Sequence, residues 1–404
     1  MRTAPIETGY SPLTTSTPPQ ERSHAATPAH GDVRSGRLLS LDVFRGATIA
    51  AMVLVNDPGE WTTTYAPLLH ARWNGWTFTD IIAPTFLWIV GVAIALTMPR
   101  PGTPLSVARP LRHVVRRTAI LFGLGIFIAA IPWAISLFDP NALATLRIPG
   151  TLQRIAVCYL CASLIVRQTG PRGQLAWALW LIAAYTVTLL VIPVPGIGAG
   201  VLTPTGNFPQ WLDRVVLGAH TKASDPLGIL GTLPSISTTL FGVLAGQLLR
   251  RDTSPETKAA ELLVMGSVML AVGEMMSGGV PVNKSLWTPS FTVLMAGIST
   301  SAFAVCYWLL DVRGYTRWSR PFAIFGLNGL VMFILSTVLS GLLTAKGVST
   351  PTRDWISLKG YLFETFFRPL GDPALASLCY AILWTLGFFL LAYLMYRRNW
   401  IVKV

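Results

Sequence analysis

The chain has 404 residues, of which 52% are hydrophobic and only 12% are charged, whereas soluble domains carry about 25% charged residues. Together with long apolar runs, this composition excludes a soluble globular protein and predicts an all-α integral membrane protein, because a helix satisfies its own backbone within lipid. The net charge of +13 predicts no nucleic-acid partner, since the basic residues lie in short loops between apolar runs, where they set topology.

Residues 1–36 are rich in Thr, Pro, Ser and Ala and contain no apolar run. Such a segment cannot bury enough surface to fold, so we expect a disordered cytoplasmic tail over 1–36 and one transmembrane domain over 37–404. The tail also lacks the apolar core and cleavage site of a secretory signal. The first apolar run is therefore expected to remain in the protein as a span.

Apolar segments that suit a hydrocarbon layer about 30 Å thick follow one another along the rest of the chain. They predict a polytopic bundle of about ten transmembrane helices, at 40–56, 78–98, 114–138, 151–169, 175–195, 227–249, 259–277, 288–310, 321–343 and 375–396. With the N-terminus in the cytoplasm, the cytoplasmic segments hold twice as many Lys and Arg residues as the opposite loops. This bias predicts that both termini are cytoplasmic.

The cytoplasmic end of the first span carries a charged pair, Asp42 and Arg45, three residues apart and therefore able to meet on one helical face. These charges could be simply interfacial. The functional alternative is that Arg45 forms a phosphate site together with Arg112, Arg116 and Arg117, because the forked donors of arginine suit phosphate.

The connection between the first two spans is much more polar than a turn requires, with Asn56, His70, Trp73, Asn74 and Asp80. The predicted topology places it on the side opposite the cytoplasm. The imidazole of His70 can take up or release a proton near neutral pH. From position alone, His70 could be a structural residue, a proton relay or a general base.

Three further polar motifs, at 147–154, 225–232 and 281–287, are expected on the same side. Their Pro and Gly residues could be mere helix punctuation. Arg154, however, lies at or inside a span, where a charge is costly unless it serves a purpose. Asn283, Lys284 and Trp287 together offer hydrogen bonds and a flat apolar face, which suit a sugar. A later segment, 355–367, predicts a short amphipathic helix at the membrane interface.

The four cysteines, Cys158, Cys161, Cys306 and Cys379, all lie in apolar runs. The C-Y-L-C spacing lacks both the context of a redox motif and a second ligand pair for zinc. We therefore expect packing residues and no metal. No internal repeat is visible, so sequence symmetry gives no support to an inverted-repeat transporter.

A resemblance is carried by separated motifs in one order: Leu41–Gly46, Val55–Asn56, His70–Gly75, Asp80–Pro84, the three motifs above and Pro321–Asn328. They resemble the catalytic domain of heparan-α-glucosaminide N-acetyltransferases and their bacterial relatives, over about residues 37–400. The resemblance implies a transmembrane acyltransferase domain over 37–404. It also implies acetyl-CoA from the cytosol as donor and, as acceptor, the amino group of a glucosamine-type sugar across the membrane.

The resemblance also implies roles for residues. His70, in the H-x-x-W-N-G motif, and Asn56 correspond to active-site residues of the family. We expect acetyl-CoA to be bound by Asp42, Arg45, Arg112, Arg116 and Arg117, and the sugar by Trp73, Asn74, Asp80, Arg154, Asp225, Asn283, Lys284 and Trp287. Two departures leave the acceptor open. The stretch Thr203–Phe208 lacks a Cys and Gly cluster of the family, and Leu227 replaces an acidic residue.

Two chemical routes stay open. His70 could remove the proton of the attacking amine while Asn56 donates a hydrogen bond to the oxyanion, or His70 could be acetylated first. The alternatives in function are O-acylation of an envelope polysaccharide or peptidoglycan sugar, and a sugar transporter or flippase without chemistry. The tail without a signal, and the lack of organelle-type luminal additions, favour the inner membrane of a bacterium. A homodimer is one expected assembly.

Overall fold

The computed structural model describes residues 38–97, 111–135, 143–222, 225–350 and 353–402, so the tail predicted at 1–36 lies outside the described residues. Each of the ten predicted apolar segments is helical over most of its described residues; the predicted ends at 98 and 136–138 lie outside the described residues, and 192–195 and 227–231 are not helical. Nine are covered by single long helices: α1 (Leu39–Asn56), α2 (Phe78–Thr97), α3 (Leu111–Ile135), α5 (Thr151–Gln168), α6 (Pro171–Val191), α8 (Thr232–Leu249), α9 (Pro255–Ser277), α10 (Pro289–Tyr307) and α14 (Pro373–Arg397). The other is divided between α11 (Arg320–Leu327) and α12 (Gly329–Ala345). The all-α membrane fold is thereby confirmed, while the cytoplasmic location of the termini stays a prediction.

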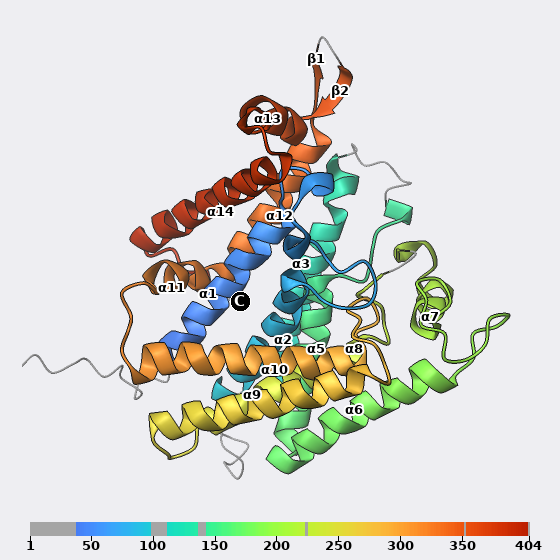
Figure 1. The fold of residues 1–404 in the computed structure, drawn as a ribbon, viewed down its shortest axis with the longest axis vertical. Helices are drawn as coiled ribbons and strands as arrows, with labels where there is room; N and C mark the ends of the chain where they lie inside the picture. Colours follow the sequence, from blue (N-terminus) through green and yellow to red (C-terminus); the bar gives the residue numbers. More distant parts are fainter. Residues whose placement is uncertain (1–37, 98–110, 136–142, 223–224, 351–352, 403–404) are drawn as a thin grey trace, which may run out of the picture.

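Within the described part of the chain, eight helices are long and apolar enough to cross a membrane, or nine if α11 and α12 form one span. The difference from the predicted ten arises at α5, which is as long as α1 but contains Gln153, Arg154 and Arg167. This helix packs against α2, α3 and α8, in the middle of the bundle (Figure 1). Polar side chains are tolerated there because they meet protein rather than lipid.

The prediction of one continuous helix at 321–343 is wrong, because the chain bends by 76° between α11 and α12. α11 crosses α1 at very close range, through Gly46 and Gly326: a Cβ on Gly46 would lie 1.8 Å from the Phe322 carbonyl oxygen. At the bend, the buried Asn328 donates a hydrogen bond to the Trp400 carbonyl (2.8 Å) and accepts one from the Val402 amide (2.9 Å). The kink therefore holds the C-terminal segment against the bundle.

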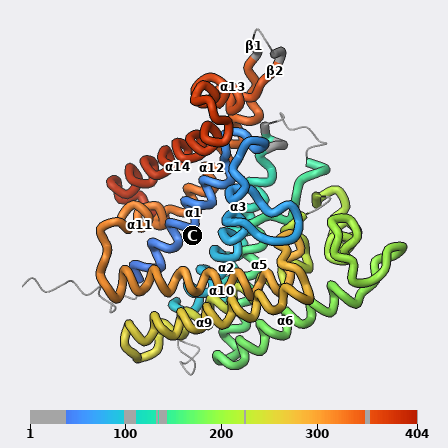
Figure 2. Tube along the Cα trace, in the orientation of Figure 1, coloured from blue at the N-terminus to red at the C-terminus, as the bar shows by residue number. Residues whose placement is uncertain are grey.

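Three elements had no counterpart among the predicted spans. A hairpin of β1 (Gly347–Thr350) and β2 (Arg353–Ser357) is antiparallel, and α7 (Phe208–Leu217) is capped by Asn207, whose side chain accepts from the Gln210 amide. The amphipathic helix expected at 355–367 is present as α13 (Leu358–Phe366), and its first predicted residues belong to β2. Figure 2 shows the hairpin and α13 beside the start of α14.

The core gathers around α2, α8 and α10, with Trp88, Phe291 and Phe303 fully buried. Glycine lets α2 and α8 touch, because a Cβ on Gly242 would lie 2.0 Å from the Trp88 carbonyl oxygen. Short 3-10 turns at Trp61–Thr63, Ala66–Leu68, Gly218–His220 and Arg368–Leu370, and a π-helical turn at Trp308–Val312, complete the elements.

Candidate active site

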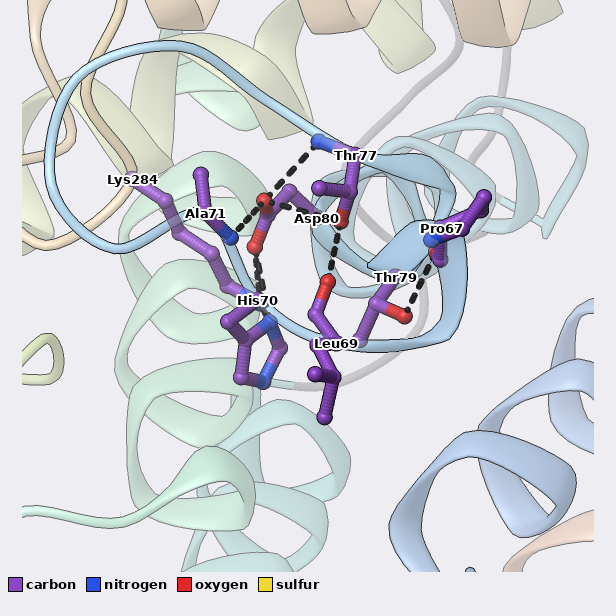
Figure 3. A network of polar contacts seen from close by, with 8 residues as sticks. All are labelled: Pro67, Leu69, His70, Ala71, Thr77, Thr79, Asp80 and Lys284. Carbon is purple, nitrogen blue, oxygen red and sulfur yellow. Dashed lines mark hydrogen bonds and ion pairs between the residues drawn. The ribbon is translucent and has the colours of Figure 1, made fainter. Parts of the chain in front are cut away.

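Asp80 organises the loop between α1 and α2. Its buried carboxylate accepts hydrogen bonds from the backbone amides of Ala71 and Thr77 (both 3.0 Å) and from the Thr77 hydroxyl (3.2 Å). The Thr77 hydroxyl also contacts the Leu69 carbonyl. A carboxylate in the first turn of a helix is favourable, because the free amides there carry partial positive charge. One acidic side chain thus ties the loop back onto the start of α2 (Figure 3).

His70 is held by this same carboxylate. Its Nδ1 lies 2.7 Å from Asp80 Oδ1, while the side chain remains 54% exposed. Among the described residues, Nε2 has no hydrogen-bond partner. If Nδ1 carries the proton and donates to Asp80, the lone pair of Nε2 points outward and can act as a base. This is the arrangement of a carboxylate-oriented histidine.

Lys284 reaches the pair from a distant part of the chain, as Figure 3 shows. Its Nζ lies 3.0 Å from His70 Nδ1 and 3.2 Å from Asp80 Oδ1. Burial lowers the pKa of Lys284, and the negative charge of Asp80 opposes that shift. The sequence assigned Asp80 and Lys284 to the sugar. The structure instead brings both into contact with His70, and their role toward a sugar stays a prediction.

Lys284 is positioned by hydrogen bonds that join its own loop, 278–288, to the loop that carries His70. The Gly75 amide donates to the Val282 carbonyl (2.7 Å), and Asn283 Nδ2 donates to Asn74 Oδ1 (3.1 Å). Gly75 has φ +94°, a conformation that glycine adopts at little cost. Trp73 is anchored nearby, through a hydrogen bond of 2.8 Å from its indole to the Leu202 carbonyl. The loop 278–288 is therefore fixed to the His70 loop.

Arg154 and Asp225 both form hydrogen bonds to other residues of the protein. Arg154 donates to the carbonyls of Pro226 (3.0 Å) and Gly228 (2.8 Å), and its guanidinium carbon lies 5.1 Å from the centre of the buried Trp287 ring. Asp225 accepts a hydrogen bond of 2.7 Å from Arg147 Nε. Burial alone would raise the pKa of Asp225, yet the hydrogen bonds and charge of Arg147 hold it below its ordinary value. These contacts fix the loop before α8.

Asn56 is the last residue of α1 and is exposed. Among the described residues, no hydrogen bond joins it to His70. The next residue, Asp57, is buried, and its carboxylate accepts from Ser336 (2.8 Å) and from the Trp384 indole (3.1 Å). Asn56 and His70 therefore lie at the same end of the bundle, with no hydrogen bond between them among the described residues.

The opposite end of α1 opens into a cavity of about 490 Å³. Three of the five residues predicted to bind acetyl-CoA line it: Asp42, Arg45 and Arg117. The predicted pairing of Asp42 with Arg45 is confirmed, at 2.7 Å. Arg112 and Arg116 also lie on α3 but are exposed and outside this lining. The cavity therefore contains only part of the predicted arginine cluster.

The sequence argument missed the other lining residues of this cavity, among them Tyr159, Asn328, Ile401 and Val402. The Arg117 guanidinium lies 4.9 Å from the Tyr159 ring centre, an attractive cation–π geometry. Ile401 and Val402 reach the cavity because Asn328 forms hydrogen bonds to the backbone of Trp400 and Val402. The pattern of polar and apolar residues along a single helix does not reveal contacts that form between two helices, such as α3 and α5, or at a kink.

A second, narrow cavity of about 20 Å³ continues the first between α1, α2, α5 and α12. The two share Ile49, Phe86, Leu152, Ile155, Gly329 and Leu330. The narrow cavity adds Met52 and Ala83, which are four residues before Asn56 and three after Asp80. The pair of cavities thus runs from the arginines toward the His70 end of the bundle.

The chain matches known proteins over most of its length. The sequence pattern of the family described as "Heparan-alpha-glucosaminide N-acetyltransferase, catalytic" matches residues 37–275, a range that includes Asn56, His70 and Asp80. The heparan-alpha-glucosaminide N-acetyltransferase of Homo sapiens is 30% identical over 355 residues, which cover 74% of this chain and 52% of the human protein. That of Mus musculus is 28% identical over 362 residues, covering 76% and 54%. The chain spans about half the length of these relatives, and it belongs to the heparan-alpha-glucosaminide N-acetyltransferase family.

Proposed function

We propose that this multi-pass membrane protein is an acetyltransferase. It moves an acetyl group from cytosolic acetyl-CoA to the amino group of a glucosamine-type sugar on the periplasmic side of a bacterial inner membrane. The observation that carries the proposal is the pair of cavities leading from Arg45 and Arg117 toward the end of the bundle that holds His70. Membership of the acetyltransferase family supports it.

The arginine-lined cavity suits the nucleotide end of the donor. Arg45 and Arg117 present forked guanidinium donors, which match phosphate oxygens. Asp42 holds Arg45 through their 2.7 Å ion pair, so that the guanidinium is oriented before the donor arrives. Asp42 and Asn56 are 14 residues apart on α1, which corresponds to about 21 Å along the helix axis. A slender pantetheine arm, rather than the nucleotide, has to cover that distance, and the narrow cavity of about 20 Å³ has to widen to admit it.

At the far end, His70 acts as general base in the direct route. Its Nδ1–H donates to Asp80, which leaves the lone pair on Nε2 free to take the proton of the sugar amine as the nitrogen attacks the thioester carbon. The C–S bond then breaks and CoA leaves as a thiolate. Asn56 donates a hydrogen bond to the oxyanion that forms on the carbonyl oxygen. Lys284 Nζ lies 3.2 Å from Asp80 Oδ1 and 3.0 Å from His70 Nδ1. Because an ammonium group cannot accept from Nδ1–H, this route requires Lys284 to be neutral, with its lone pair toward Nδ1 and an N–H toward Asp80.

The covalent route uses the same geometry. His70 Nε2 attacks the thioester carbon, the C–S bond breaks, and an acetyl-imidazole forms that the sugar amine then cleaves. An exposed Nε2 on a ring fixed through Nδ1 is compatible with either route. Incubation with labelled acetyl-CoA in the absence of a sugar separates them. A burst of labelled protein supports the covalent route, and no label on the protein supports direct transfer.

The test of the proposed function is an assay of the purified protein with radiolabelled acetyl-CoA and a panel of amino sugars. The wild-type protein is expected to form an N-acetyl amide, and His70→Ala is expected to lower the rate by about 10²–10⁴-fold, the usual contribution of a general base. Wild-type rates in His70→Ala would contradict both routes. Mass spectrometry of the product distinguishes an amide from the ester of an O-acyltransferase, and sugar movement without consumption of acetyl-CoA would indicate a transporter.

A further inference from the structure

A third and larger cavity lies away from both sites, between α12, α13 and α14. It is an apolar groove of about 860 Å³, lined among others by Leu339, Leu343, Leu383, Gly387 and Leu391. Figure 1 shows α12 and α14 diverging below α13. Both α12 and α14 belong to segments apolar enough to span a membrane, so we infer that the open side of the groove faces the hydrocarbon layer.

The groove has one polar edge. Trp384 lines it, and its indole donates to the buried carboxylate of Asp57 at 3.1 Å. Asp57 directly follows Asn56, the residue proposed to stabilise the oxyanion. The groove is therefore joined through one hydrogen bond to the loop that carries the proposed catalytic residues.

A cationic side chain, that of Lys359, lies near the same edge of the groove. Lys359 on α13 places its Nζ 5.6 Å from the ring centre of Tyr380, which lines the groove. Burial lowers the pKa of Lys359, and Asp57 opposes the shift. A second cation beyond the groove, Arg368, lies 3.1 Å from Glu364 and 3.8 Å from Glu60. An apolar groove that ends at a lysine is complementary to a hydrocarbon chain that ends in a phosphate.

We propose that this groove binds the lipid anchor of the acceptor, so that the acceptor is an amino sugar joined through phosphate to a long hydrocarbon chain. The inference rests on the proposed function and names the class of its acceptor. The chain lies between α12 and α14, the phosphate lies near Lys359, and the sugar extends over the Asn56–Asp80 loop. A water-soluble sugar makes no contact with this groove, whereas the chain of a lipid-linked sugar packs against its lining and holds the attached amine near the Asn56–Asp80 loop.

Gly387→Leu tests the groove. Gly387 is a lining residue, and no atom of another residue lies within 4 Å of the position where its Cβ would be. A side chain added at this position therefore starts in open space, and a leucine is directed into the groove. The matched control is Leu390→Phe, on the same helix and 60% exposed but outside the lining. Both variants are assayed in nanodiscs with labelled acetyl-CoA, using glucosamine and a synthetic glucosaminyl phosphate that carries a dodecyl chain as acceptors.

Wild type and Leu390→Phe are expected to show kcat/KM about tenfold or more higher for the dodecyl-linked acceptor, because a chain held in the groove keeps the attached amine near His70. Gly387→Leu should remove this advantage and leave kcat/KM for glucosamine unchanged. Lys359→Ala should weaken only the lipid-linked acceptor, with Lys359→Arg retaining its use.

Equal kcat/KM for the two acceptors in the wild-type protein would overturn the inference and leave the proposed function intact. The inference would also fail if Gly387→Leu lost copurified phospholipid, or altered the oligomeric state, without changing use of the dodecyl-linked acceptor. Failure of the wild-type protein to acetylate either acceptor or to consume acetyl-CoA would instead count against the proposed function.

Discussion

At the scale of single residues, the contact of Asp80 with His70 matters most for the proposed chemistry. Asp80 is buried and accepts hydrogen bonds from the loop backbone as well as from the imidazole. The carboxylate therefore fixes both the path of the loop and the orientation of the ring. A residue that holds the tautomer of a histidine in this way affects the chemical step rather than the binding of substrate.

Asp80→Asn should therefore lower kcat by about 10²–10⁴-fold, because the neutral amide no longer favours a proton on His70 Nδ1. KM for acetyl-CoA should stay unchanged, since the arginine-lined cavity lies at the other end of the bundle. The measurement is steady-state kinetics with varied acetyl-CoA. Thr77→Val is the control, because it removes one contact of Asp80 to the loop but none to His70. An equal loss of kcat in both variants would show that loop structure alone accounts for the effect.

Gly329 controls the proposed path of the donor. It lines both the wide and the narrow cavity, and a Cβ there would lie 2.1 Å from Ile49 Cδ1. Gly329→Ala should push Ile49 into the passage and reduce kcat/KM for acetyl-CoA by about tenfold or more, since small displacements from reactive geometry are costly. Gly341→Ala on the same helix is the control, because its Cβ would be in ordinary contact, 3.9 Å from Ile131. Equal kinetics in the two variants would argue against this path.

At the scale of elements, the sequence was sufficient for the ten apolar helical segments and for one local ion pair, but not for α7 or the β1–β2 hairpin. Apolar runs predict all ten helical segments within a few residues of their ends, apart from the break at Asn328, and the spacing of Asp42 and Arg45 predicts their ion pair. The break was not predictable, because it depends on the close crossing of α11 over Gly46 of α1. The contact of Lys284 with His70 was missed for the same reason, since the two are 214 residues apart and meet only through packing.

The loop before α8 predicts a response of stability to pH. Arg147 holds the pKa of Asp225 below its ordinary value of 3.8, against the effect of burial. The stabilisation is therefore fully present above pH 3.8 and is lost as the pH falls through the lower pKa of the folded state. Asp225→Asn should cost about 1–3 kcal/mol of the free energy of unfolding at pH 7, where it breaks a charged hydrogen bond.

Thermal unfolding in nanodiscs at a series of pH values measures this effect. The gap between wild type and Asp225→Asn should be constant from pH 7 to about 5 and narrow as the pH falls below 3.8. A Glu261→Gln variant serves as control, because its pair with Arg251 is largely exposed and should contribute little. A gap that does not change with pH would show that the carboxylate charge is not the cause.

At the scale of the whole molecule, the two groups of candidate residues lie at opposite ends of the bundle. Asp42 and Arg45 belong to the first turns of α1, and Asn56, His70 and Asp80 lie at or beyond its other end. The charge bias of the loops predicted this separation, although it left open which side chains meet within each end. A protein built in this way can receive two substrates from two sides of a membrane.

The most direct test of the account is acetyl transfer across a membrane of defined sidedness. Proteoliposomes of uniform orientation receive labelled acetyl-CoA only on the face that carries Arg45 and a glucosamine acceptor only on the face that carries His70. The account predicts labelled N-acetyl product on the acceptor face with the wild-type protein and almost none with His70→Ala. Product that forms only when both substrates share one face, or that forms equally in His70→Ala, would contradict it.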